Sequence, residues 1–161
     1  MTKPEPQKKA VLPFISIAAV LIGLGLVLYL PGLIQTDNQV SALKLINPDC
    51  SLNNGECVAK LDQHEIALEI KSETIRSATP MLFEVTLNNI QADQVMLDLK
   101  GKEMFMGLNQ VMLMPVADDP NRWQGEVTLA VCTTGEMVWV SSVVLEKGGQ
   151  KTQADFEFIA R

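Results

Sequence analysis

The sequence predicts an all-β fold, an immunoglobulin-like Greek-key sandwich preceded by one N-terminal transmembrane helix. Three observations lead to this prediction: a long apolar run near the start, a period-two alternation of apolar and polar residues after it, and turn signals about every 8–12 residues. The chain has 161 residues, of which 47% are hydrophobic. Because domains commonly run to about 100–150 residues, there is room for one domain and a short appendage.

The apolar run extends from Val11 to Leu30 and contains no charged residue. As a helix, this run would cover about 30 Å, which is the thickness of a bilayer's hydrocarbon core. Pro31 and Gly32 then end the helix. The sequence therefore predicts four segments: a cytoplasmic tail (1–10), a transmembrane helix (11–31), a linker (32–41) and an extracytoplasmic β-domain (42–161).

Lysines indicate the orientation of this span. Lys3, Lys8 and Lys9 precede it, and the next Lys or Arg is Lys44. Since cytoplasmic flanks carry the excess of positive charge, we expect a single-pass protein of the bacterial inner membrane with its C-terminal domain in the periplasm. A cleaved signal peptide is the alternative, with small residues at 40–42 as the cleavage site. The apolar run is longer than the usual h-region of about 7–15 residues, which favours a retained anchor.

Alternating residues predict eight or nine short strands beyond the linker, with no amphipathic helix among them. Trp123 and Trp139 are expected to fill the core between two sheets. The expected strands are 42–46, 58–61, 66–70, 81–88, 95–99, 104–114, 123–131, 137–145 and 154–159.

The cysteines are interpreted for an oxidising compartment. Cys50 and Cys57 bracket a segment with two asparagines and a glycine, which can fold back on itself, so we expect a small structural disulfide between them. A redox-active or metal-binding pair is the sharper alternative. Cys132 is left over, and it is interpreted as a buried apolar residue, as a partner for Cys50 or Cys57, or as a soft metal ligand.

Methionines are the least ordinary feature of the sequence. Met104 and Met106, like Met112 and Met114, are two residues apart, which in a strand places both members of a pair on one face. A turn at 107–110 would bring the pairs side by side, and thioethers suit Cu(I) where carboxylates do not. The sequence thus predicts a candidate Cu(I) site, whose ligands would be Met104, Met106, Met112, Met114, Cys132 and Met137.

Two other interpretations of the methionines remain open. Methionine on alternating strand positions is common core filler, and it also serves as an adaptable contact surface. In the second case the domain would be a periplasmic scaffold that docks a membrane partner and binds no metal.

Composition and absent motifs exclude several functions. A net charge of −6 argues against general nucleic-acid binding, and a single histidine excludes multi-histidine metal sites. The sequence contains no phosphate-binding loop and no nucleophile elbow. We therefore expect a non-catalytic accessory protein.

Two stretches, GKEMFMGLNQVMLMP at 101–115 and RWQGEVTLAVCTTGEMVWVSSVVL at 122–145, follow DCSLNNGEC at 49–57. Together they resemble an uncharacterised family of single-span proteobacterial membrane proteins and, more loosely, the FixH/YtkA-like group of membrane-anchored β-sandwich domains. The resemblance implies an extracytoplasmic immunoglobulin-like domain that assists copper delivery or the assembly of haem-copper oxidases, with the oxidase or its assembly factors as partners. No histidine accompanies the methionines of this sequence, which departs from copper-chaperone patterns.

Overall fold

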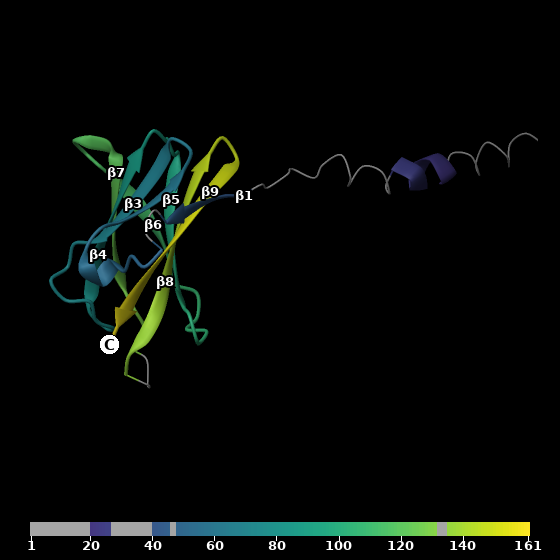
Figure 1. Ribbon diagram of the computed structural model, residues 1–161. Coiled ribbons are helices and arrows are strands. Elements are labelled where there is room, and N and C mark those ends of the chain that lie inside the picture. The colour runs from purple at the N-terminus through teal and green to yellow at the C-terminus, as the bar shows by residue number, and fades with distance from the viewer. Residues whose placement is uncertain (1–19, 27–39, 46–47, 132–134) are drawn as a thin grey trace, which may run out of the picture. The chain divides into compact units, whose positions relative to one another are not determined.

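The computed structural model describes residues 20–26, 40–45, 48–131 and 135–161 (Figure 1). Contacts divide the chain into two units, residues 1–37 and 38–161. In the first unit, residues 20–26 are helical and exposed. Within the described ranges, no helix has the length and apolar character needed to cross a membrane. Most of the predicted span at 11–31 and of the linker at 32–41 lies outside those ranges.

The second unit is built from strands, which confirms the all-β prediction (Figure 1). A short 3-10 helix, η1 (Leu52–Asn54), lies between two of them. The strands are β1 (Val40–Leu45), β2 (Cys57–Leu61), β3 (His64–Ile70), β4 (Pro80–Asn88), β5 (Gln94–Gly101), β6 (Gln110–Val116), β7 (Asp119–Thr128), β8 (Met137–Lys147) and β9 (Gln150–Ala160).

Hydrogen bonds join these strands into a closed barrel in the order β1-β2-β3-β4-β7-β6-β5-β8-β9. Neighbouring strands are antiparallel except for β1 and β9, which are parallel. β1 closes the barrel because its first half pairs with β9, where Val40 lies opposite Lys151, and its second half pairs with β2, where Leu45 lies opposite Ala59.

Alternate residues of each strand point into the barrel and form one core. Trp139, Phe83, Phe156 and Phe158 are fully buried, and Trp123 is nearly so, which confirms the two tryptophans as core residues. The Phe83 and Phe158 rings meet edge to face, with centroids 5.9 Å apart. The sequence alternation therefore arises from burial of one side of each strand.

One predicted strand is wrong. The sequence predicts strand structure over 104–114 with a turn at 107–110, but β6 begins at Gln110, and residues 102–109 form a loop that follows β5. The Leu99 amide donates to the Asn109 carbonyl at 2.9 Å, which closes this loop at its base. Gly107 has a φ of +85°, a conformation that a strand does not use.

The two ends of the barrel differ in the length of their connections. At one end, which we call the turn end, the connections lie at 62–63, 89–93, 117–118 and 148–149. β1 also begins at the turn end, because Val40 pairs with Lys151 at the start of β9 (Figure 1). The opposite end, which we call the loop end, holds the longer connections at 46–56, 71–79, 102–109 and 129–136.

Candidate functional site at the loop end

The predicted disulfide between Cys50 and Cys57 is present at the loop end, with a Cα–Cα distance of 5.9 Å. It closes a short loop that contains η1, and Leu52 of η1 is buried in the core. Ser51 caps η1, since its hydroxyl oxygen accepts from the Asn53 amide at 3.5 Å. The disulfide thus fixes both ends of a segment that would otherwise be a free loop.

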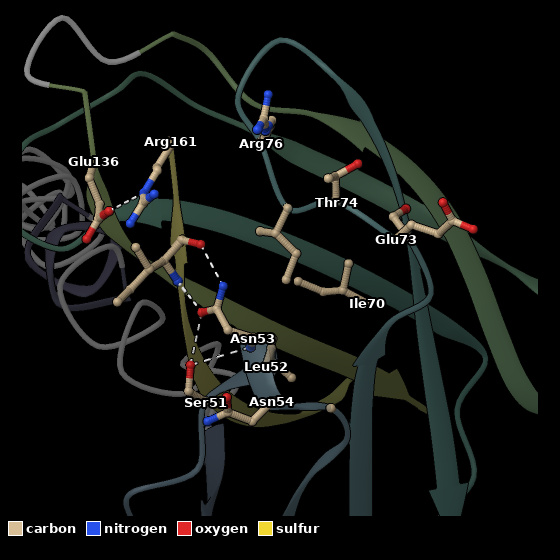
Figure 2. Close-up of a pocket in the computed structure, with 14 residues that line it drawn as sticks. Ser51, Leu52, Asn53, Asn54, Ile70, Glu73, Thr74, Arg76, Glu136 and Arg161 are labelled. Carbon is tan, nitrogen blue, oxygen red and sulfur yellow. Dashed lines mark hydrogen bonds and ion pairs between the residues drawn. The ribbon is translucent and has the colours of Figure 1, made fainter.

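Asn53 fastens η1 to the end of β9 (Figure 2). Its side-chain nitrogen donates to the Ile159 carbonyl at 2.8 Å, and its side-chain oxygen accepts from the Ile159 amide at 2.6 Å. The amide therefore pairs with a backbone edge in the way that a neighbouring strand would. Upstream, Ser51 forms a parallel bridge with Glu157, so η1 and its cap cover the end of β9.

A hollow of about 780 Å³ opens beside η1, and we call it the large hollow (Figure 2). Its volume lies within the range of ligand pockets, which is about 300–1,000 Å³. Glu136 and Arg161 form an ion pair in its wall. Its lining comes from η1 and its flanks (51–55), from the β3–β4 connection and the end of β3 (70, 72–76), and from the ends of β8 and β9 (136, 159, 161).

A second hollow of about 320 Å³ adjoins the first, and we call it the small hollow. The two hollows share Glu136 and Ile159. The remaining lining residues of the small hollow are Glu103, Met104, Met137 and Val138.

Gly101 allows the 102–109 loop to pass close to β8. A Cβ atom at Gly101 would lie 2.4 Å from the Met104 carbonyl oxygen and 2.9 Å from the terminal methyl of Met137. The Lys102 amide donates to the Val138 carbonyl at 2.9 Å and continues this approach. The small hollow is thus formed where the loop leaves β5 and crosses the start of β8.

The structure separates the methionines that the sequence grouped together. Met104 and Met137 line the small hollow, and Met106 packs partly buried against the core. Met112 lies on the outer face of β6 opposite Met96 of β5, and Met114 lies opposite Gln124 of β7. The predicted hairpin, in which Met104 and Met106 would lie beside Met112 and Met114, is therefore wrong. The strand that pairs with β6 on the other side of the 102–109 loop is β5.

Cys132, the remaining predicted ligand, lies outside the described residues. Within the ranges that the structure describes, no three histidine, cysteine, aspartate or glutamate side chains are grouped so as to hold a metal ion. Of the predicted ligands that the structure describes, Met104 and Met137 line a common hollow.

Sequence reasoning missed the most exposed apolar side chains at the loop end. Phe105 is 80% exposed and Leu108 is 82% exposed, and both belong to the 102–109 loop. The predicted strand pairs Met104/Met106 and Met112/Met114 placed Phe105 inside a strand and Leu108 in the turn between the pairs, so neither side chain stood out as a surface residue. Gly101 before the loop and Gly107 within it were the signal that could have revealed the loop.

Comparisons with known proteins give no family for this chain. No protein-family model matches it, and no curated protein matches it. One matching solved structure is a DUF4785 family protein from Legionella pneumophila, with 16% identity and a TM-score of 0.39. The match covers 61% of this chain and 28% of that protein, so this chain corresponds to less than a third of that protein's length.

Proposed function

We propose that the protein is anchored in the membrane with its barrel in the periplasm, has no catalytic activity, and docks a membrane-protein partner through its loop end. The observation that carries this proposal is the exposure of Phe105 and Leu108 in the 102–109 loop, whose residues Glu103 and Met104 line the small hollow. Large apolar side chains exposed on one loop are typical of interaction sites, and loops on a rigid scaffold are where proteins place binding residues.

The order of the strands indicates the kind of scaffold that carries the loop end. We infer that β3 to β9 follow the immunoglobulin arrangement, since β3-β4-β7-β6 corresponds to its ABED sheet and β5-β8-β9 to its CFG sheet. β1 and β2 would then be an addition that closes the two sheets into a barrel. In this correspondence the loop end holds the A–B, C–D and E–F connections, the end opposite the antigen-binding loops of immunoglobulin variable domains. The exposed side chains of the 102–109 loop, and not this correspondence, therefore support binding at the loop end.

The proposed anchor fits this use of the loop end. If residues 11–31 span the inner membrane, the tether enters the barrel at Val40, at the turn end. β8 runs between the two ends with eleven residues, a length of about 36 Å at about 3.3 Å per residue. The tether and the proposed docking residues would therefore belong to opposite ends of the barrel, and the partner would be the periplasmic part of a membrane protein, such as an oxidase or one of its assembly factors.

Site-specific crosslinking in intact membranes tests this function. A photoreactive residue in place of Phe105 is expected to give one discrete adduct, and the same residue in place of Asp118 at the turn end is expected to give none. Adding Leu108→Ser to the protein that carries the photoreactive residue at position 105 should weaken the adduct. The barrel should stay folded, because the Leu108 side chain is exposed. Equal crosslinking from both ends, or from neither, would contradict docking through the loop end.

Cu(I) handling is the second candidate, and one observation favours it. Met104 and Met137 line the same small hollow, so two thioethers face one space in a compartment where free thiolates are scarce. Cys132 precedes Met137 by five residues and is the third candidate ligand. Met106, Met112 and Met114 would contribute less, since they lie elsewhere on the barrel.

A matched pair of double variants tests Cu(I) binding. Met104→Leu with Met137→Leu is expected to lower Cu(I) uptake in competition with a chromogenic chelator. Met112→Leu with Met114→Leu, on the outer face of β6, should leave uptake unchanged. If the two double variants behave alike, the small hollow is not a copper site.

A further inference from the structure

We propose that the small hollow binds an aliphatic cationic side chain, a lysine or an arginine, of the docked partner. This inference rests on the docking function proposed above, and it names the chemistry that the loop end recognises. Three features carry it: the apolar walls of the hollow, the carboxylates at the hollow, and the availability of one of these carboxylates.

The walls of the small hollow are apolar. Met104, Met137, Val138 and Ile159 supply them, and Met137 is itself buried. A lysine or arginine carries a methylene chain that packs on apolar surface while its charged end stays near water. The flexible thioethers of Met104 and Met137 can adjust to such a chain without loss of contact.

Two carboxylates also line the hollow, and they make its lining negative. Glu136 is paired with Arg161, whose side chain is 79% exposed. Glu103 forms no ion pair within the described ranges. Its neighbour Lys102 does not neutralise it, because the Lys102 ammonium contacts both Glu157 carboxylate oxygens, at 2.7 and 2.9 Å.

The charge at Glu103 selects among occupants. An anionic group in the hollow would be repelled by Glu103, and a purely apolar group would gain no attraction from that exposed carboxylate. A cationic head satisfies it, while the stem of the same side chain fills the apolar part of the hollow. The net charge of −6 on the whole chain also attracts basic partners during approach.

Titration with short peptides tests the proposal on the full chain in detergent micelles, isotopically labelled for amide spectra. The probes are acetyl-Gly-Lys-Gly-amide and acetyl-Gly-norleucine-Gly-amide, which has the carbon chain without the ammonium group. The lysine peptide is expected to shift the Val138 and Ile159 amides saturably. Equal binding of the norleucine peptide, or no saturable shift with lysine, would overturn the proposal.

Three variants sharpen the result. Glu103→Gln is expected to raise the Kd of the lysine peptide about threefold to fivefold, the effect of one partly exposed ion pair. Asp118→Asn, an exposed carboxylate at the turn end, is the matched control and should leave the Kd unchanged. Met104→Leu with Met137→Leu should also preserve peptide binding, because leucine keeps the wall apolar. Loss of binding in this double variant would show that the peptide contacts the methionine sulfur atoms specifically, and that packing of the lysine methylene chain on an apolar wall is not sufficient.

The two proposals fail separately. If crosslinking from position 105 captures a partner but the lysine peptide does not bind, docking stands and the role of the small hollow falls. If the lysine peptide binds through Glu103 and no partner is captured, the hollow is a cation site and the docking function falls.

Discussion

The turn end and the loop end of the barrel are held in different ways. At the turn end, short connections need few additional contacts, among them the ion pair of Lys147 with Asp93 at 2.7 Å. At the loop end, the long connections are tied by a disulfide, by the Asn53 amide and by the close approach at Gly101. Longer connections cost more entropy to order, so the end with the longer connections requires the stronger ties.

The largest effect should follow removal of the disulfide. Cys50→Ser with Cys57→Ser is expected to lower the free energy of unfolding by about 2–3 kcal/mol, because the reduced chain gains the entropy of an open loop. Urea unfolding of the full chain in detergent, followed by the fluorescence of buried Trp123 and Trp139, measures this loss. Reductant should destabilise the wild type by the same amount and leave the double variant unchanged. A variant as stable as the wild type would show that the loop end is ordered without the disulfide.

Crowding at Gly101 should have the next largest effect. Gly101→Ala places a Cβ atom against the Met104 carbonyl and the Met137 methyl, and this overpacking is expected to cost about 1–3 kcal/mol. Gly125→Ala is the matched control, since its nearest contact is the end of the Leu113 side chain, which can move more easily than backbone. If Gly125→Ala costs more in the same urea titration, the close approach of the 102–109 loop is not what requires glycine.

The sequence could predict those features of the two ends that depend on residues close together in the chain. Burial of alternate residues is visible in the sequence, and so is a disulfide between cysteines seven positions apart, because both depend on near neighbours. The closure of the barrel was not predictable in this way, because β1 pairs with both β2 and β9, and β9 lies about a hundred residues away in the sequence. Cross-strand partners of this kind are set by tertiary packing.

The candidate site escaped prediction for the same reason. The alternating methionines of 104–114 match a strand, yet only the partner of each segment decides whether it becomes one: β6 pairs with β5, and residues 102–109 are left as a loop. The small hollow joins Met104 with Met137 and Ile159, which come from three separate segments. Equally, the large hollow depends on Asn53 reaching β9, a contact between residues 106 positions apart.

Loss of the Asn53 amide should have a moderate and local effect. Asn53→Ala leaves the Ile159 amide and carbonyl without these partners, which is expected to cost about 1–2 kcal/mol. Hydrogen exchange should accelerate at the Ile159 amide and remain unchanged at the turn end. Asn54→Ala is the control, because no hydrogen bond of the Asn54 side chain is found in the described part of the chain. Unchanged exchange at Ile159 in the Asn53 variant would show that η1 does not hold β9.

The smallest effect concerns the turn end and depends on pH. The hydrogen bond from the Lys147 ammonium, followed by that from the Gly148 amide, lowers the pKa of Asp93 below its ordinary value of 3.8. A lowered pKa in the folded state means that the charged form stabilises the fold above pH 3.8, and that this stabilisation is lost as the pH falls through the folded-state pKa.

Asp93→Asn should therefore be slightly less stable than the wild type at neutral pH and equally stable in strong acid, where the wild-type carboxyl is also neutral. Added salt should shrink the difference at neutral pH, since Asp93 and Lys147 are both exposed. Asp118→Asn, at the neighbouring β6–β7 turn, should show no such dependence. A difference at Asp93 that persists in strong acid would mean that the turn end is held by the shape of its turn and not by this charge.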